Sequence, residues 1–166
     1  MTDRLAALMT IALRDVPERP GVLADFYARH RHDPLIVDKW LSLQAAIPEA
    51  ATLERVKALT THAAFSFGNP NRVRALIGAF AMANQTQFNR VDGGGYEFLV
   101  DTVLALDPKN PQVAARLLSA LKSWRVLEPT RRALAQAALR RVAAAPALSR
   151  DVSDITARAL GDGKAA

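Results

Sequence analysis

The chain has 166 residues, enough for one domain that buries a core of its own. It contains no cysteine, which excludes disulfides, thiolate metal sites and a cysteine nucleophile and is typical of a protein in the reducing cytoplasm. The net charge of +6 allows acidic partners, but the lysines and arginines are spread along the chain as on a solvated helical surface. We therefore expect a cytoplasmic protein without disulfides.

The N-terminal residues 1–15 place Arg4 before an apolar stretch, as a secretory signal peptide does. They lack a small-residue cleavage site, and Asp15, Glu18 and Arg19 follow soon after. No apolar run reaches the ~18–20 residues that a bilayer span requires. This segment is therefore predicted to be an amphipathic helix, and no membrane association is expected.

Along the rest of the chain, apolar residues recur at i, i+3, i+4 and i+7, and no segment alternates apolar and polar residues. Val73, Leu76, Ile77 and Phe80 form the clearest of these stripes. The pattern predicts an all-α fold. Helices are expected over residues 2–13, 20–30, 34–46, 50–62, 70–83, 95–106, 111–123, 129–144 and 149–160.

Three of the predicted helices begin alike, at Asp33-Pro34, Asn69-Pro70 and Asn110-Pro111. In each, a short polar side chain caps the first free N–H groups and proline takes the first helical position. The starts are spaced by roughly 36 and 41 residues, close to the ~40–47 residues of HEAT and armadillo helix pairs. The spacing favours a right-handed α-solenoid of such pairs over residues 1–160, with residues 161–166 as a flexible tail, and an irregular helical bundle stays open.

A run of three glycines, Gly93 to Gly95, interrupts the helical pattern. Glycine permits a positive φ angle, so this run is expected to form a tight connector before the helix that starts near Tyr96. It contains neither a Walker lysine nor the strand that a dinucleotide-binding fingerprint needs.

Candidate catalytic and metal-binding groups do not assemble into a known motif. His30 and His32 stand two residues apart, on different faces of a helix, and His62 is alone. There is no His-Glu-x-x-His pair and no Gly-x-Ser-x-Gly turn. Glu97 and Asp101 share a helix face but nothing nearby explains a raised pKa, so they are interpreted as a solvated acidic edge. No catalytic residue and no metal site are predicted in this chain.

Arginines are the remaining candidates for a functional site. The pairs at 131–132 and 140–141 lie on one predicted helix and could form a basic ridge. Arg72 and Arg74 flank the apolar stripe of their helix on opposite sides of Val73. Arg116 takes a position in its own helix similar to that of Arg74. Alternatively, these arginines lie at the edge of the buried helix face without a ligand, with their methylene groups buried and their guanidinium groups hydrated.

Three blocks carry a resemblance to a known family: NPNRVRALIGAFA at residues 69–81, DGGGYEFLV at 92–100 and NPQVAARLL at 110–118. In order and spacing they resemble the C-terminal domain of bacterial aminopeptidase N, a family of large zinc-dependent aminopeptidases of the gluzincin type. Residues 1–8 and 38–45 agree as well, so the resemblance extends over nearly the whole chain.

The resemblance implies a non-catalytic part of a longer enzyme, in which Met1 is an internal position. In the family, the zinc ligands and the glutamate base lie in an upstream thermolysin-like domain. The C-terminal α-solenoid covers that domain, closes the cavity around the active site and limits access to peptides. The implied zinc therefore belongs to the parent enzyme, and the implied partners are its catalytic domain and its peptide substrates.

On the same resemblance, Arg74, Gln112 and Arg116 are expected on the cavity wall, near the C-terminal side of the substrate. Guanidinium groups in a semi-enclosed space attract peptide carboxylates and carbonyls. They are expected to assist binding without taking part in the chemical step, whereas Arg72 is expected to be structural or peripheral.

Two other functions stay open. The chain could be an independent α-solenoid scaffold that binds a protein through its concave face, or a basic solenoid that binds nucleic acid. The second is less expected, because aromatic residues make up 6% of the chain and do not interleave with the basic ones. A domain separated from its catalytic partner is also expected to expose an apolar patch larger than the usual few hundred Å² and to self-associate.

Overall fold

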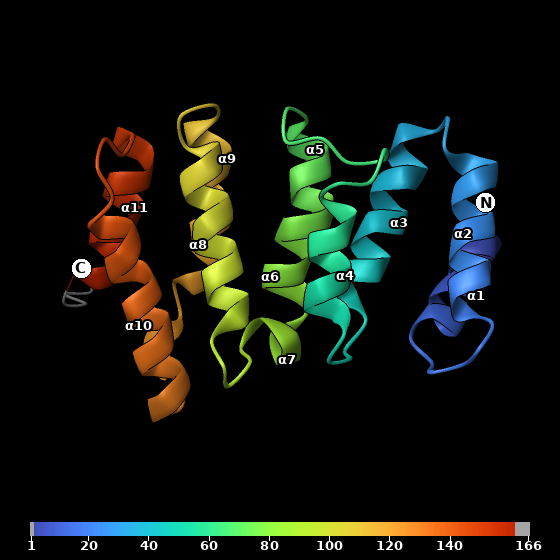
Figure 1. Cartoon of the computed structure of the whole chain (residues 1–166), viewed down its shortest axis with the longest axis horizontal. Helices are drawn as coiled ribbons and strands as arrows, with labels where there is room; N and C mark the ends of the chain where they lie inside the picture. Colours follow the sequence, from blue (N-terminus) through green and yellow to red (C-terminus); the bar gives the residue numbers. More distant parts are fainter. Residues whose placement is uncertain (1, 162–166) are drawn as a thin grey trace. The chain divides into compact units, whose positions relative to one another are not determined.

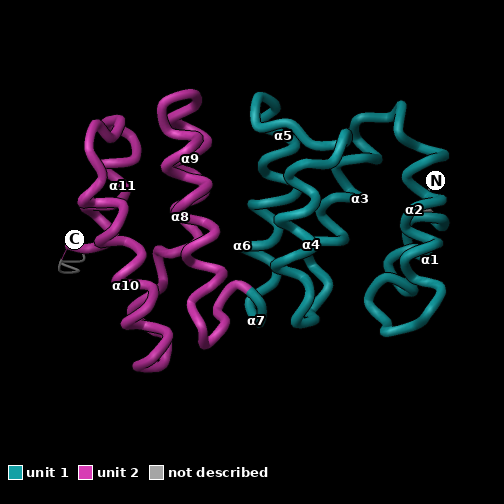
Figure 2. The backbone as a smooth tube through the Cα atoms, viewed as in Figure 1, with its two compact units in different colours: residues 1–87 teal, residues 88–166 magenta. Residues whose placement is uncertain are grey.

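The computed structural model describes residues 2–161, which contain helices and turns but no strand. The all-α prediction is confirmed. The chain divides into two compact units, residues 1–87 and residues 88–166 (Figure 2). The assignment of residues 1–160 to one domain stays a prediction, and residues 162–166 of the expected tail lie outside the described residues. None of the described helices is long and apolar enough to cross a membrane.

The first unit is built around helix α3, which packs against α2, α4 and α6 and against a π-helical turn, η1. Helix α1 packs against α2 and α3 (Figure 1). The elements of this unit are α1 (Thr2–Ala12), α2 (Arg19–His30), α3 (Pro34–Ala46), α4 (Thr52–Leu59), α5 (Pro70–Val73), η1 (Arg74–Gly78), α6 (Ala79–Ala83) and α7 (Gln85–Phe88). The last residue of α7, Phe88, is the first residue of the second unit.

The second unit consists of four longer helices and two short 3₁₀ turns. Helix α8 packs against α9 and α10, and α11 packs against the same two helices. The elements are α8 (Gly94–Leu106), α9 (Pro111–Leu118), the 3₁₀ turns η2 (Ser119–Leu121) and η3 (Trp124–Val126), α10 (Pro129–Ala143) and α11 (Arg150–Leu160) (Figure 1).

The three Asx-Pro helix starts form as predicted. Asp33 Oδ1 accepts hydrogen bonds from the backbone N–H groups of Leu35 (3.0 Å) and Ile36 (3.2 Å). Asn69 caps α5 in the same way, and Asn110 Oδ1 accepts from the third residue of α9 at 3.2 Å. These bonds satisfy N–H groups that have no partner within the helix, so the sequence alone determines where each helix begins.

The glycine run starts α8 one residue earlier than predicted, at Gly94. Gly93 has a φ angle of +74°, which glycine adopts without strain. A Cβ atom on Gly95 would lie 2.2 Å from the carbonyl oxygen of Phe88, so only glycine fits there. Hydrogen bonds from Arg90 and from the Gly94 N–H lower the pKa of Asp92 to about 2, which keeps its carboxylate charged across this turn.

Two predicted helices are shorter than expected. Residues 60–62 do not extend α4, because the hydroxyl groups of Thr60 and Thr61 donate to the carbonyls of Lys57 (2.6 Å) and Ala58 (2.8 Å) and close its last turn. Helix α9 ends at Leu118 and continues only as the 3₁₀ turn η2. The short elements α7 and η3 were not predicted, because three or four residues carry no helical periodicity.

The helix predicted over residues 70–83 forms but contains the π-helical turn η1. Four consecutive residues of this turn are buried, from Ala75 to Gly78. Four such residues do not fit on one face of a regular α-helix, so this segment is enclosed on more than one side. The predicted stripe of Val73, Leu76, Ile77 and Phe80 is fully buried, which confirms its place in the core.

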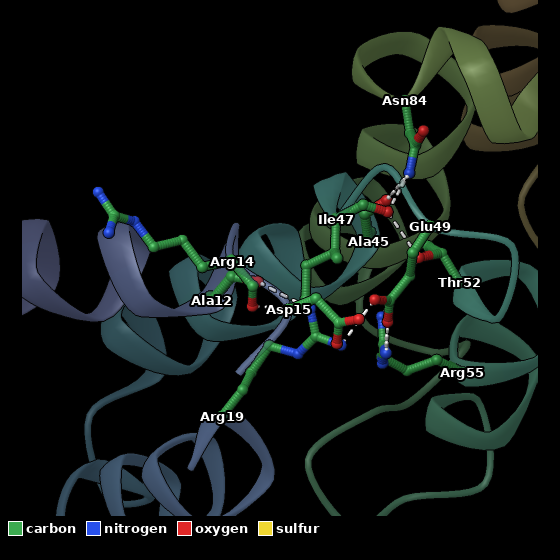
Figure 3. Close-up of polar contacts among 10 residues, drawn as sticks. All are labelled: Ala12, Arg14, Asp15, Arg19, Ala45, Ile47, Glu49, Thr52, Arg55 and Asn84. Carbon is green, nitrogen blue, oxygen red and sulfur yellow. Dashed lines mark hydrogen bonds and ion pairs between the residues drawn. The ribbon is translucent and has the colours of Figure 1, made fainter. Parts of the chain in front are cut away.

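A polar network centred on Glu49 ties α2 to the connection between α3 and α4. Arg19 Nη2 donates to Glu49 Oε2 at 2.6 Å, and Arg55 donates to the other carboxylate oxygen (Figure 3). Arg19 Nη1 also donates to the Arg14 carbonyl at 3.1 Å, beyond the end of α1. Burial by itself would raise the pKa of Glu49, but hydrogen bonds and attraction from Arg55 and Arg19 outweigh it, and the pKa is lowered.

Asn84 joins the end of α6 to the same connection. Its Nδ2 donates to the carbonyls of Ala45 (2.9 Å) and Ile47 (2.8 Å), as Figure 3 shows. The residue is 2% exposed, and its amide gives the buried Ala45 carbonyl a donor and adds one to the Ile47 carbonyl, which also accepts from the Thr52 hydroxyl at 2.6 Å.

In the second unit, η3 holds the C-terminal end of α11. The Trp124 indole N–H donates to the Ala159 carbonyl at 2.9 Å. The Arg125 guanidinium donates to the carbonyls of Ala159 (2.7 Å) and Leu160 (3.0 Å) and to that of Gly161. Its carbon lies 4.6 Å from the centre of the Trp124 ring. A cation at a helix C-terminus satisfies the last carbonyls and opposes the helix dipole.

We expect Arg125→Ala to lower the free energy of unfolding by about 1–2 kcal/mol, because several carbonyl contacts and a cation–π contact are lost. Amide hydrogen exchange in the last turn of α11 should also become faster. Urea unfolding and exchange monitored by NMR measure the two effects. Arg140→Ala, an exposed position on α10, is the matched control; equal effects of the two changes would contradict the role of Arg125.

We expect Glu49→Gln to lower the free energy of unfolding by about 1–2 kcal/mol near neutral pH, since two charge-assisted hydrogen bonds are weakened. The folded-state pKa of Glu49 lies below its ordinary value of 4.5, so its stabilisation is present above that value. This stabilisation is lost as the pH falls through the lowered pKa of Glu49.

The difference between the original chain and Glu49→Gln should therefore shrink on acidification, measured by urea unfolding at neutral and acidic pH. Glu54→Gln is the control, because Glu54 forms only an exposed pair with Lys57. A difference in the free energy of unfolding that stays constant with pH would contradict the assignment of this stabilisation to the Glu49 carboxylate.

Candidate functional site

Arg74 stands at the start of η1 and is exposed. Its guanidinium donates to the side-chain oxygen of Asn71, one turn earlier on the same helix. That oxygen is neutral, so it leaves the positive charge of Arg74 uncompensated. Among residues 2–161, the exposed Arg74 guanidinium thus has this one local contact.

Arg72, two residues earlier, has a different role. Its Nη1 donates to the Pro34 carbonyl at 2.8 Å and to the carboxylate of Asp38, and the side chains of Arg72 and Asp38 are 13% and 20% exposed. The bond ties the α5–η1 helix to α3. Arg72 is thus structural, as expected, whereas the expected place of Arg74 on the cavity wall stays a prediction.

Gln112 and Arg116 lie one turn apart on α9, and both are exposed. Gln112 lines a shallow depression of about 320 Å³ together with Asp151, Asp154 and Arg158 of α11. Within residues 2–161 the Arg116 guanidinium forms no hydrogen bond or ion pair. Because Arg74 belongs to the other unit, a common surface for the three residues stays a prediction.

Of the four arginines expected to form a basic ridge on α10, Arg131 and Arg141 pair with carboxylates. Arg131 donates to the Asn89 carbonyl at 2.6 Å and to Glu128, and Arg132 donates to a backbone carbonyl. Arg141 pairs with Glu97 and Asp101, the two carboxylates predicted to form a solvated edge. The hydrogen bond with Asp101 is the main reason why the pKa of Arg141 is raised. These side chains therefore contribute to structure, which weakens the case for nucleic-acid binding.

Two of the three histidines, His30 and His62, pack against aromatic rings. The His30 ring lies 4.6 Å from that of Phe26, and the His62 ring lies 4.9 Å from Tyr27 and 5.4 Å from Trp40. In the described part of the chain, no three histidine, aspartate or glutamate side chains come together in a way that could hold a metal ion. The GAFAMAN segment, residues 78–84, is helical up to Ala83, as expected.

The first unit has an apolar groove whose position was not predicted from the sequence. It has a volume of about 480 Å³ and runs along α3 between α1 and α6. Leu5 and Met9 of α1 and Leu13, the residue after its end, form one wall, and Met9 and Leu13 remain 46% and 49% exposed. The i, i+4, i+8 spacing of these residues is visible in the sequence, but the sequence does not show that the stripe faces outward.

Three curated relatives, each named aminopeptidase N, match almost the whole chain. The chain is 41% identical over 160 residues to the protein of Haemophilus influenzae, 42% over 162 residues to that of Caulobacter vibrioides and 39% over 160 residues to that of Escherichia coli. The matches cover 96–97% of this chain and only 18–19% of each relative. The chain thus spans about a fifth of the length of these relatives.

A solved structure agrees with the sequence matches. The crystal structure of Legionella pneumophila aminopeptidase A in complex with aspartic acid superposes with a TM-score of 0.89 at 33% identity. It matches 96% of this chain and 19% of that protein.

One family description, "Domain of unknown function (DUF3458_C) ARM repeats", matches residues 1–161. ARM repeats are stacked helix pairs, so the α-solenoid prediction is confirmed together with the resemblance. The chain belongs to the DUF3458_C family of ARM repeats and corresponds to the C-terminal, non-catalytic part of aminopeptidase N.

Proposed function

We propose that this chain acts as the C-terminal lid of a zinc-dependent aminopeptidase N. It closes the active-site cavity and controls the access of peptides, while the rest of the enzyme removes their N-terminal residues. The observation that carries this proposal is the match of nearly the whole chain to about a fifth of three aminopeptidase N sequences. The catalytic zinc then lies elsewhere in the same polypeptide, in the cytoplasm.

The exposed arginines support a role in peptide binding. Arg72 and Arg141 pair with carboxylates of the fold, whereas among the described residues Arg74 has one neutral partner and Arg116 has none. Guanidinium groups without a counter-charge are suited to peptide carboxylates and carbonyls. On this proposal, Arg74, Gln112 and Arg116 face the substrate cavity and contribute to binding alone.

The apolar groove supports the proposal that another part of the same polypeptide packs against this domain. A monomer in water rarely leaves a continuous apolar wall such as Leu5, Met9 and Leu13 uncovered. ARM repeats bury their faces against neighbouring segments, and the relatives contain about four fifths of their length outside the matched region. An independent scaffold that binds another protein through the groove is the alternative.

In a full-length enzyme that carries this domain, we expect Arg74→Ala and Arg116→Ala each to raise KM by about three- to tenfold with little change in kcat. The effect should be larger for peptides with a free C-terminal carboxylate than for amidated ones. Steady-state kinetics with both kinds of peptide measure it, and Arg140→Ala is the control. Unchanged KM for both variants would remove these arginines from the cavity wall.

The isolated 166-residue chain provides the accompanying check. It should not hydrolyse alanyl or leucyl fluorogenic substrates, with or without added zinc. Zinc-dependent turnover by the purified chain would overturn the assignment of catalysis to another part of the polypeptide.

We expect the isolated chain to self-associate weakly through the apolar groove, because the residues that the structure describes leave it open. Met9→Lys should weaken this association by about tenfold or more, since it places a charge on the apolar wall. Light scattering and sedimentation over a range of concentrations measure the association. Leu35→Lys is the control, because Leu35 is 71% exposed and lies outside the groove; equal effects of the two changes would contradict this role of the groove.

A further inference from the structure

A second hollow in the first unit has a different character from the apolar groove. It has a volume of about 380 Å³ and lies between α2, α3 and the end of α4. Three aromatic side chains line it: the rings of Tyr27 and Trp40 stack at 4.7 Å, and the His62 ring lies against both. Leu23 and Leu59 complete its apolar surface. Such a surface accepts a flat ring.

Two polar groups at this hollow lack partners. Gln44 is 6% exposed, and its Nε2 donates no hydrogen bond within the described residues. The His62 Nδ1 accepts the Ala64 backbone N–H at 3.0 Å, so the neutral ring carries its proton on Nε2, for which no acceptor is present in residues 2–161. The residues Gln44 and His62 both line the hollow, while the Gln44 Nε2 atom itself is buried.

The unpartnered Gln44 amide calls for an explanation, because a buried donor without an acceptor costs free energy. The terminal torsion of glutamine is broad, so the amide can turn either of its polar atoms toward a molecule in the hollow. A ligand that accepts a hydrogen bond would remove this cost.

The charge around the hollow favours an anion. Arg19 and Arg55 both line it and share the single carboxylate of Glu49, which leaves one positive charge in excess. Asp15 lies 3.6 Å from Arg19, but its side chain is 99% exposed, so solvent screens its charge. The two guanidinium groups are 11% and 22% exposed and are screened less.

We propose that this hollow is a binding site for an aromatic carboxylate: a ring stacked among Tyr27, Trp40 and His62, and a carboxylate that accepts hydrogen bonds from Gln44 and His62 beside the Arg19–Glu49–Arg55 cluster. The same chemistry occurs in a free arylalkanoate and in the C-terminal aromatic residue of a peptide. The proposal does not depend on the lid function, since it rests on groups of the first unit alone.

The test is a titration of the chain with 3-phenylpropanoate. The chain has two tryptophans, so fluorescence in a Trp124→Phe variant reports on Trp40 in the hollow. Saturation-transfer NMR on the unaltered chain measures the same binding if that variant does not fold. We expect saturable binding with a dissociation constant of about 1 mM, the range for a ligand of this size.

Two ligand analogues and two variants test the assignment of the groups. Propanoate lacks the ring and 3-phenylpropanamide lacks the charge, and each should bind at least about fivefold more weakly. Gln44→Met should weaken binding of 3-phenylpropanoate by about fivefold or more while the fold stays intact, because the change removes a buried amide that has no partner. Gln136→Met, on α10 of the other unit, should leave binding unchanged.

The peptide Gly-Phe and its C-terminal amide distinguish the two sources. Tighter binding of Gly-Phe than of 3-phenylpropanoate assigns the site to peptide C-termini, and the reverse assigns it to free arylalkanoates. The proposal is overturned if 3-phenylpropanoate shows no saturable binding, which would leave the Gln44 amide with an ordered water only. It is also overturned if Gln44→Met binds 3-phenylpropanoate as well as the original chain does.

Discussion

The first unit depends on the burial of α3. Seven of its thirteen residues are buried, which is more than one face of a helix provides, so no single neighbour can cover it. Helices α2, α4 and α6 and the turn η1 all pack against α3 and together cover it. The aromatic hollow lies along α3 beside Trp40 and Gln44, and the apolar groove lies along it beside Leu43 and Ala46, between α1 and α6.

The arginines show why net charge is a poor guide to function in this chain. A guanidinium group has five donors in a fixed plane, so it can satisfy carbonyls at helix ends and carboxylates on neighbouring helices at the same time. Arg19 and Arg131 each bind a backbone carbonyl and a carboxylate, and Arg125 binds the carbonyls at the end of α11. The charge available to a ligand is therefore concentrated at the few arginines that the fold does not use, such as Arg74 and Arg116.

The sequence predicted what is determined locally. Capping by Asp33, Asn69 and Asn110 and the buried stripe around Leu76 depend on residues a few positions apart, and the structure has them as expected. The Glu49 network joins side chains 30 and 6 residues apart, and nothing in the pattern around Glu49 indicates its partners. The π-helical turn and the outward-facing stripe of α1 follow from packing between helices, which periodicity does not determine.

The aromatic hollow and the apolar groove use different sets of neighbours and have α3 in common. Occupation of one could influence the other only by moving α3, and any such coupling would be reciprocal. Helix α3 is held firmly: the Trp40 indole N–H donates to the Leu23 carbonyl at 2.8 Å, Leu41 is fully buried, and Arg72 binds Asp38. A segment seated in the groove and a carboxylate bound among the aromatic rings should therefore bind independently, because the packed core between them has one arrangement.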